Sequence, residues 1–342
     1  MRCCTNPVQI EQLNPAENAT DLAAAYPAFR TGTREAKPGL PAPGQTRLRT
    51  LALGRDGQFS QTLAAVAPDG TVLGIGIYGG ELNQNPDLAW INLFVPEQAR
   101  QQAADANVNV TAHLMTHALQ IAAADGRTRI STQLSDAAGQ QAFAKQLGGR
   151  NLNTILAATL DLAAIDHAQY ATWAAPNTDN AGYELVRWSD RCPNELAQSY
   201  CTAQDAIHDQ PAGDFAYEFT RTEVEQMRAN EERLTRYGAK HHVVAAVDDA
   251  GHVAGFAEFV RYPDEPESVD IWSTGVAHDH RGHGLGLRLK AASSLWMREL
   301  DPAARWVGTA NHEGNEPMLR INRALGYRGA ERWYTYEFPV SG

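Results

Sequence analysis

Cysteine and basic residues are scarce in this sequence. Its 342 residues include only four cysteines, at positions 3, 4, 192 and 201, with no metal-ligand spacing and too few to make a disulfide framework. Lys and Arg number 29 against 40 Asp and Glu, which gives a net charge of −11. This balance argues against a nucleic-acid partner, because phosphates require a basic surface. It is compatible with a cationic or amine substrate.

Long apolar segments are also missing. No run reaches the roughly 18 residues that a membrane span needs, and the N-terminal MRCCTNPVQIEQLNP lacks the apolar core of a secretory signal. We therefore expect a cytoplasmic protein with reduced thiols and no membrane partner, as a monomer or homodimer. Hydrophobic residues make up 43% and charged residues 20%, as in globular proteins, and the length favours two domains.

The second half of the sequence alternates short strands and helices. Leu285, Leu289, Ala292 and Trp296 fall on one helical face, which predicts a helix there. The expected elements are a hairpin over 241–262, a strand over 269–277, this helix, a strand over 304–310, a helix over 316–325 and a strand over 332–338. Helices are also expected after Pro193 and over 223–238.

The first half repeats this order of elements. We expect a hairpin over 59–80, a strand over 88–95, a helix over 109–126, a strand over 129–134, a helix over 137–149 and a closing strand over 152–162. The offset of 181 residues between Val95 and Val276 indicates a duplicated domain rather than a solenoid repeat. The sequence thus predicts domains over 1–164 and 181–342, with a linker over 165–180 that runs into the Pro/Asn/Gly-rich AAPNTDNAG.

The most informative segment is RGHGLG, residues 281–286, between an apolar strand and a helix. Its glycines allow the backbone to approach a ligand, and the following helix offers unpaired N–H groups, which together can bind a diphosphate. The segment matches neither a Walker A loop nor the dinucleotide pattern G-x-G-x-x-G. His278, His280 and His283 could suggest a metal site, but we favour phosphate-facing or solvated side chains and expect no metal.

Arg281-x-x-Gly284-x-Gly286 after an apolar strand resembles the acyl-CoA pyrophosphate loop of the GNAT family of N-acetyltransferases. The segment from Asn315 through Asn322 to Gly326-Tyr327 resembles the second signature of that family. The resemblance covers about 181–342, and the order of elements agrees. It implies an α/β (α+β) fold with two tandem GNAT domains, each a mixed, mostly antiparallel central sheet flanked by helices.

The resemblance implies acetyl-CoA as the co-substrate. Backbone groups of Val276 and His278 would hold the pantetheine arm, and the Val276 amide would polarise the thioester carbonyl. Asn311 and Asn315 would make polar contacts to CoA, although Asn315 equally suits a helix cap. The pyrophosphate would be bound by the amides of Arg281, Gly282, His283, Gly284, Leu285 and Gly286.

A base or an anchor for the acceptor amine is expected on the strand before the loop. The position that the family uses, eleven residues ahead of Arg281, holds Asp270, which equally suits a solvated strand start. Alternation predicts that Asp270, Trp272, Thr274 and Val276 share one face. Glu258 on the neighbouring strand is the second candidate base. Trp272 could line the acceptor site or belong to the core, and Asp214 could bind a cationic substrate.

The usual general acid of the family is missing. Its tyrosine position holds Asn322, so Tyr327, Tyr334, Tyr336 or water would have to protonate the leaving thiolate.

The first half keeps the order of elements but not the motif residues. The loop frame falls on Arg100-x-x-Ala103-x-Asp105, Ala89 matches Asp270, and Ala137 and Ala144 match the two asparagines of the second signature. We therefore expect this half to be a degenerate GNAT-like domain without an acyl-CoA loop.

We expect an acetyl-CoA-dependent N-acetyltransferase that modifies the primary amine of a small molecule, such as an antibiotic or other natural product, by direct attack in a ternary complex. Two alternatives stay open. One is a non-catalytic acyl-CoA-binding or protein-interaction module, motivated by the missing tyrosine. The other is a protein or peptide N-acetyltransferase.

Overall fold

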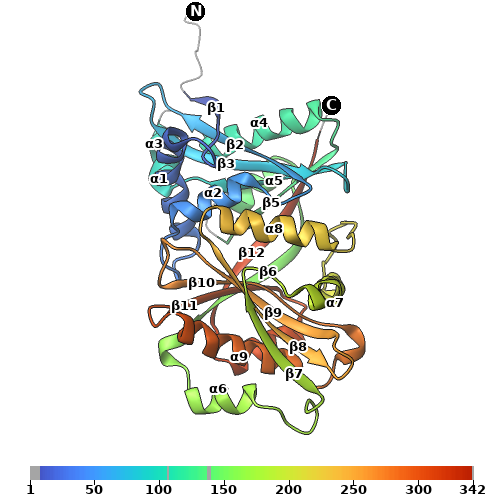
Figure 1. Ribbon diagram of the computed structural model, residues 1–342. Helices are drawn as coiled ribbons and strands as arrows, with labels where there is room; N and C mark the ends of the chain where they lie inside the picture. The colour runs from blue at the N-terminus through green and yellow to red at the C-terminus, as the bar shows by residue number, and fades with distance from the viewer. Residues whose placement is uncertain (1–7, 106–107, 137–139, 341–342) are drawn as a thin grey trace, which may run out of the picture. The chain divides into compact units, whose positions relative to one another are not determined.

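The structure is a computed structural model that describes residues 8–105, 108–136 and 140–340 (Figure 1). Contacts divide these residues into two compact units. Unit 1 holds the residues up to Pro38, those of Ala42–Thr154 and those from Arg332 on. Unit 2 holds Gly39–Pro41 and Ile155–Glu331.

Unit 1 is built on a sheet with the strand order β1-β2-β3-β4-β5-β12. Its pairs are antiparallel except for β4 and β5, which are parallel. The strands are β1 (Gln9–Leu13), β2 (Gln58–Val66), β3 (Val72–Glu81), β4 (Leu88–Phe94), β5 (Arg129–Ser135) and the end of β12 (Arg328–Pro339). The helices are α1 (Ala19–Ala36), α2 (Gln45–Leu53), α3 (Glu97–Asp105), α4 (Val110–Ala124) and α5 (Gln140–Gln146).

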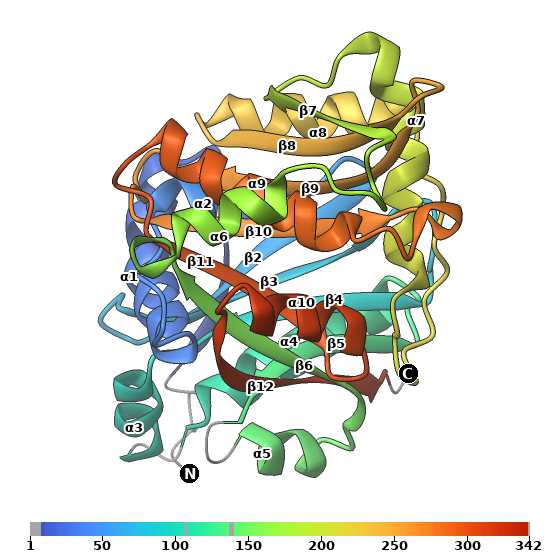
Figure 2. The same cartoon turned by 90° about the horizontal axis from the view of Figure 1, so that it is seen from below.

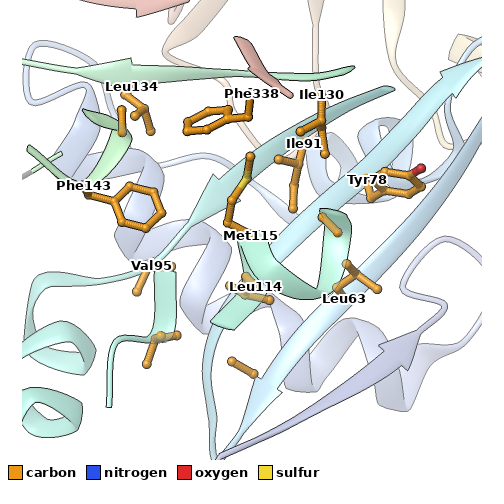
Figure 3. Close-up of a cluster of buried hydrophobic side chains, with 14 of the residues drawn as sticks. Leu63, Tyr78, Ile91, Val95, Leu114, Met115, Ile130, Leu134, Phe143 and Phe338 are labelled. Carbon is orange, nitrogen blue, oxygen red and sulfur yellow. The ribbon is translucent and has the colours of Figure 1, made fainter. Parts of the chain in front are cut away.

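Helices cover both faces of the unit 1 sheet. On one face, α4 contributes Leu114 and Met115 to a cluster that also contains Phe338 of β12, as Figure 3 shows. On the other, α1 contributes Leu22 and Phe29 to a second cluster. The expected helix over 109–126 is confirmed as α4, which begins where the Asn109 side chain accepts from the Ala112 N–H at 3.0 Å.

Unit 2 has the strand order β6-β11-β10-β9-β8-β7. Its strands are the end of β6 (Arg150–Asp161), β7 (Tyr183–Ser189), β8 (Lys240–Asp248), β9 (Val253–Arg261), β10 (Ser268–Val276) and β11 (Trp306–His312). Its helices are α6 (His167–Ala174), α7 (Asn194–Gln204), α8 (Val224–Arg236), α9 (Leu285–Leu300) and α10 (Glu316–Ala324). Short 3-10 turns are η1 (Leu162–Ala164), η2 (Asp205–Asp209) and η3 (His278–His280).

The two faces of the unit 2 sheet carry different helices. Figure 1 shows α8 and α9 on opposite sides of β8, β9 and β10. Leu285 and Leu289 of α9 pack on Ala257, whereas α7 and α8 cover Phe256 through Tyr200 and Met227. Figure 2 shows α6 beside α9, with which it is in contact. This mostly antiparallel sheet with helices on both faces confirms the predicted fold class.

Two strands connect the units in a way that the sequence did not predict. Residues 152–162 were expected to close the first domain, but Ile155–Asp161 belong to unit 2, where they pair with β11. Conversely, residues 332–338 were expected to end the second domain, and they pair with β5 in unit 1. The alternation of apolar residues indicates a strand but carries no information about its partner, which explains the difference.

No helix among the described residues is long and apolar enough to cross a membrane.

Candidate active site in unit 2

The centre of the site is a gap between two parallel strands. β10 and β11 pair over only three positions, from Ser268↔Trp306 to Asp270↔Gly308. Beyond Asp270, β10 continues along β9 to Val276, while β11 continues along β6 to His312. The strands therefore part directly after Asp270.

Backbone groups of β10 point into this gap. The Ala277 N–H donates to the Ala254 carbonyl at 2.9 Å. Because bonded and non-bonded residues alternate along an antiparallel pair, Val276 directs its N–H and C=O away from β9 and toward the gap. The Val276 carbonyl accepts from Arg281 Nε at 3.0 Å. The arrangement suits the expected role of the Val276 amide toward a thioester, which stays a prediction. His278 is exposed in η3.

The loop over 281–286 ends at the N-terminus of α9. Gly282 and Gly284 have φ values of 87° and 72°, a left-handed backbone that disfavours L side chains. Gly284 is the N-cap of α9 and offers no side chain to its first N–H groups. Those groups and the helix dipole therefore remain for an anion. Gly286 allows close packing of α9 against α10, because a Cβ at this position would lie only 3.0 Å from Ile321 Cδ1 of α10. Leu285 is buried against the sheet.

The loop is held by residues that sequence reasoning assigned to a linker. Asn180 is 1% exposed, and its Nδ2 donates to the His283 carbonyl at 3.2 Å. The buried Arg288 donates to the carbonyls of Ala174, Asn180 and Tyr183 at 2.9–3.2 Å. Residues 165–180 thus include α6 and a turn that fixes the loop. In the sequence, Arg288 could have been recognised as a basic residue on the apolar face of the helix that is now α9.

The histidines around the loop have separate partners. His278 Nδ1 contacts Asp279 at 3.0 Å, His280 Nδ1 contacts the Tyr183 hydroxyl at 3.0 Å, and His283 Nδ1 contacts the Asp179 carbonyl at 2.9 Å. A hydrogen bond from His278 lowers the pKa of Asp279. Within the described part of the chain, no group of three His, Cys, Asp or Glu could hold a metal.

The side chain of Arg281 reaches a neighbouring loop. Its NH2 pairs with Asp209 of η2 at 2.6 Å. η2 contacts β10, and a Cβ at Gly314 would lie 4.0 Å from Pro211 Cβ. The segment that follows η2 therefore extends from β10 to the turn after β11, across the open end of the gap.

That segment carries a series of aromatic side chains. The rings of His208 and Phe219 stack at 4.3 Å, and Tyr217 lies 4.9 Å from Phe219 and 6.0 Å from Phe215. Phe219 is 49% exposed. Acidic residues lie among these rings at Asp209, Asp214 and Glu218, all exposed. The sequence analysis identified Asp214 as a possible contact for a cationic substrate but missed the aromatic residues around it.

A β-bulge corrects the predicted face of β10. Asp270 pairs with Val260 and Ile271 with Phe259, but Ser273 pairs with Glu258, so Trp272 is an extra residue. Trp272 packs with Leu234 of α8 and Val260. Asp270 and Trp272 therefore share the α7/α8 face, as predicted. Thr274 and Val276 lie on the opposite face, since a Cβ at Gly255 would meet Val276 and Leu289 of α9.

Glu258 of β9 is buried on the side of the unit 2 sheet that α7 and α8 cover. It is 6% exposed, and its Oε2 accepts from the Tyr200 hydroxyl and from His241 Nε2, both at 2.9 Å. Burial alone would raise the pKa of Glu258, but hydrogen bonds from His241, Tyr200 and Ser273 hold it below its ordinary value. Burial raises the pKa of Tyr200. The pair is therefore a carboxylate and a phenol. His241 was not among the predicted residues.

The asparagines of the second signature divide between two tasks. The Asn315 side chain accepts from the Met318 N–H at 3.3 Å and caps α10, which is the alternative role considered for it. Asn322, 4% exposed, donates from Nδ2 to Asn311 Oδ1 at 2.7 Å. Among the described residues, Asn322 Oδ1 is buried without a partner. Asn311 lies on β11 beyond the point where the strands part.

The structure does not bring the candidate tyrosines together. Tyr327 is buried in unit 2, where burial raises its pKa. Tyr334 and Tyr336 belong to unit 1, where the Tyr334 hydroxyl donates to Asp136 at 3.4 Å. Lys290 of α9, 2% exposed, lies 4.7 Å from the Tyr327 ring, and burial lowers its pKa to about 7. Sequence reasoning missed this buried amine.

Unit 1 has the same parting of strands without the loop. β4 and β5 pair only from Leu88↔Arg129 to Trp90↔Ser131. Ala89 and Ala144, which match positions of the active motif, are fully buried. Arg100 pairs with Glu97 at 2.6 Å. The side chains of Ala103 and Asp105, residue Ala137 and the cysteines 3 and 4 lie outside what the structure describes.

Comparisons with known proteins agree with this geometry. A model of the acetyltransferase (GNAT) family matches residues 205–327. A solved tandem GNAT protein from the clavulanic acid biosynthesis pathway is 22% identical, with a TM-score of 0.79 over 98% of this chain and 99% of that one. A GCN5-related N-acetyltransferase from Sphaerobacter thermophilus is 16% identical, with a TM-score of 0.64 over 99% and 98%.

A putative acetyltransferase from Pyrococcus horikoshii is 13% identical, with a TM-score of 0.58 over 98% of this chain and 91% of that one. No curated protein matches the sequence. These structures establish the fold, and the family match covers the gap and the loop. The chain therefore has a tandem GNAT fold, and residues 205–327 contain an acyltransferase domain that matches the model of the GNAT family.

Proposed function

We propose that the protein is an acetyl-CoA-dependent N-acetyltransferase that modifies the primary amine of a small molecule in a ternary complex. The observation that carries this proposal is the parting of β10 and β11 directly beside a left-handed glycine loop at the N-terminus of α9. The gap suits an extended pantetheine arm, and the loop suits a pyrophosphate. The chemistry that acetyl-CoA supplies when bound is an acetyl group activated as a thioester.

Each group of the site in unit 2 would have a separate role in binding or catalysis. N–H groups over 281–286 bind the pyrophosphate, and the Val276 N–H donates to the oxygen that becomes negative as the amine adds. Asp270, at the point where the strands part, attracts the ammonium form of the acceptor. The carbonyl of Val276 is already bonded to Arg281, so the amide is the group left for the substrate.

The segment over 208–219 favours an acceptor with an apolar or aromatic body. Stacked rings attract a cation at their faces, and the acidic residues among them add to that attraction. The segment also contacts β10 through η2, which places it at the open end of the gap. A hydrophobic amine fits this combination better than a sugar or a polyamine.

Release of CoA thiol from acetyl-CoA tests the proposal. A panel should contain aromatic and aliphatic monoamines, polyamines, aminoglycosides and lysine peptides, and we expect the fastest release with an aromatic amine. Phe219→Ala should raise the KM for that amine about 2- to 5-fold, the value of an exposed cation–π contact. Leu300→Ala, at a 39% exposed position at the end of α9, is the matched control and should not change it.

The outcomes separate the alternatives. Tight acetyl-CoA binding without thiol release from any amine would identify a binding module instead. Release only with lysine peptides would identify a protein or peptide acetyltransferase.

A further inference from the structure

The side chain of Arg281 bonds to two protein groups. Its Nε donates to the Val276 carbonyl at 3.0 Å, and its Nη2 pairs with Asp209 at 2.6 Å. Val276 is the last residue of β10, and Asp209 is the last residue of η2. Because the N–H donors of a guanidinium are fixed in a planar fork, one side chain holds the end of the strand and the segment after η2 at a set distance.

Unit 1 keeps the same arginine without the glycines. Arg100 and Val95 each lie 181 positions before their counterparts in unit 2, and the glycine positions of the motif hold alanine and aspartate in this half. Arg100 Nη1 nevertheless donates to the Val95 carbonyl at 2.9 Å, and its Nη2 lies 2.6 Å from Glu97 and 3.9 Å from Glu35. The contacts of this arginine therefore do not depend on a phosphate-binding loop.

The acidic partners come from matching places in the two units. Glu35 lies in the last turn of α1, which follows the edge strand β1. Asp209 ends η2, which continues directly from α7, and α7 follows the edge strand β7. In each unit the arginine thus connects the end of the strand that borders the gap to the end of the helical segment after the edge strand.

In unit 2 this connection reaches the aromatic rings. Asp209 is adjacent in the chain to His208, whose ring stacks on Phe219 at 4.3 Å. The ends of the same segment are joined where the Thr222 N–H donates to Asp205 at 3.1 Å. The segment is therefore a loop closed at its base, and its stacked rings begin next to the carboxylate that the guanidinium holds.

We propose that Arg281 is a positioning residue for the acceptor amine, whose side chain fixes the segment over 208–219 at the gap instead of binding the pyrophosphate. This inference rests on the proposed function. The backbone N–H groups over 281–286 remain the groups for the pyrophosphate. The motif residue thus has two separate tasks, one for its amide and one for its side chain.

Electrostatics distinguishes positioning from direct attraction. Loss of the Asp209 carboxylate alone would weaken the attraction of a cationic amine. Loss of the Arg281 guanidinium alone would strengthen that attraction and weaken the attraction of a diphosphate. The double variant Arg281→Gln, Asp209→Asn keeps the net charge, so a change in its KM for the amine reports the position of the segment.

Steady-state kinetics with the best aromatic amine and calorimetric titration with acetyl-CoA test the proposal on the full chain. In the double variant, the KM for the amine should rise about 2- to 10-fold, because an exposed ion pair and a hydrogen bond to a carbonyl are both lost. The kcat and the acetyl-CoA Kd should stay within about 2-fold of the native values, since neither side chain contacts the reacting atoms. Arg281→Gln alone should also raise this KM, against the direction that its charge predicts.

A second exposed ion pair of unit 2 supplies the matched control. Arg187 Nη1 lies 3.0 Å from Glu299 Oε2, and both side chains are exposed. Arg187→Gln combined with Glu299→Gln also keeps the net charge, and it should leave the KM, the kcat and the acetyl-CoA Kd unchanged.

Two results would overturn the inference while leaving the proposed function intact. One is acetyl-CoA binding weakened 10-fold or more by Arg281→Gln with an unchanged KM for the amine, which would make the side chain a phosphate ligand. The other is an unchanged KM in the double variant. If that variant fails to fold, Asp209→Asn at about 0.5 M salt, where direct attraction is screened, provides the same measurement. Absence of thiol release from the native protein with every amine would instead refute the proposed function.

Discussion

A single charge placed at Gly282 tests the role of the loop most directly. Gly282 has a φ of 87°, and a Cβ there would meet no atom within 4 Å. Gly282→Glu therefore introduces backbone strain of roughly 1–2 kcal/mol and a carboxylate, but no steric clash. A carboxylate about 6 Å from one phosphate charge is repelled by about 0.7–3 kcal/mol for effective dielectric constants of 80 to 20.

This repulsion predicts a measurable loss of affinity. It corresponds to acetyl-CoA binding weakened about 3- to 100-fold for each phosphate charge, with a smaller effect at high salt. Calorimetric titration of the full chain at two ionic strengths measures it.

Gly251→Glu is the control for strain, because Gly251 has a φ of 83°, equally open surroundings and a position in the β8–β9 turn. Both variants should lose similar stability, about 2–8 °C in Tm. Only Gly282→Glu should bind acetyl-CoA more weakly, and Gly282→Lys should bind as well as the native protein or better. Equal affinities for Gly282→Glu and Gly251→Glu would refute the assignment of the loop.

Three further changes test the site and its support. Asp270→Asn should raise the KM for the amine and leave the acetyl-CoA Kd and the pH profile unchanged, in steady-state kinetics. Arg288→Met removes three hydrogen bonds to backbone carbonyls and should cost roughly 2–5 kcal/mol and weaken acetyl-CoA binding. Arg187→Met, which removes an exposed ion pair, should cost about 0–1 kcal/mol in the same denaturation assay. Burial lowers the pKa of Lys290 to about 7 in the folded protein, whereas its value in the unfolded chain is ~10.4. Between these two pH values the unfolded chain binds one more proton, so the free energy of unfolding rises with pH by up to ~1.4 kcal/mol per pH unit. Lys290→Met should flatten that rise in the same denaturation assay.

The sequence predicted the parts of the site that depend on local backbone requirements. The glycines of the loop are needed for left-handed φ values and for close packing, so their spacing identified the loop and the helix after it. The position of Asp270 followed from its distance along the chain to the loop. Both inferences involve residues that are close along the chain, with Asp270 eleven positions ahead of Arg281.

The parts that depend on pairing between distant strands were not predictable in the same way. Alternation placed Thr274 and Val276 on the wrong face, because one extra residue at Trp272 reverses every later side chain without changing the composition of the strand. His241 and Glu258 became visible as a pair only through the register of β8 against β9. In the same way, Arg288 and Asn180 are 108 positions apart and meet through tertiary packing.

The two strands that belong to both units also affect how the chain folds during its synthesis. Unit 1 lacks its sixth strand until residues 332–339 have been synthesised, because β12 pairs with β5. Until then β5 presents an open edge, which is a site for pairing with other chains. We infer that the sheet of unit 1 is completed only after β12 has left the ribosome, and we expect a fragment ending before Arg332 to expose the β5 edge and to aggregate.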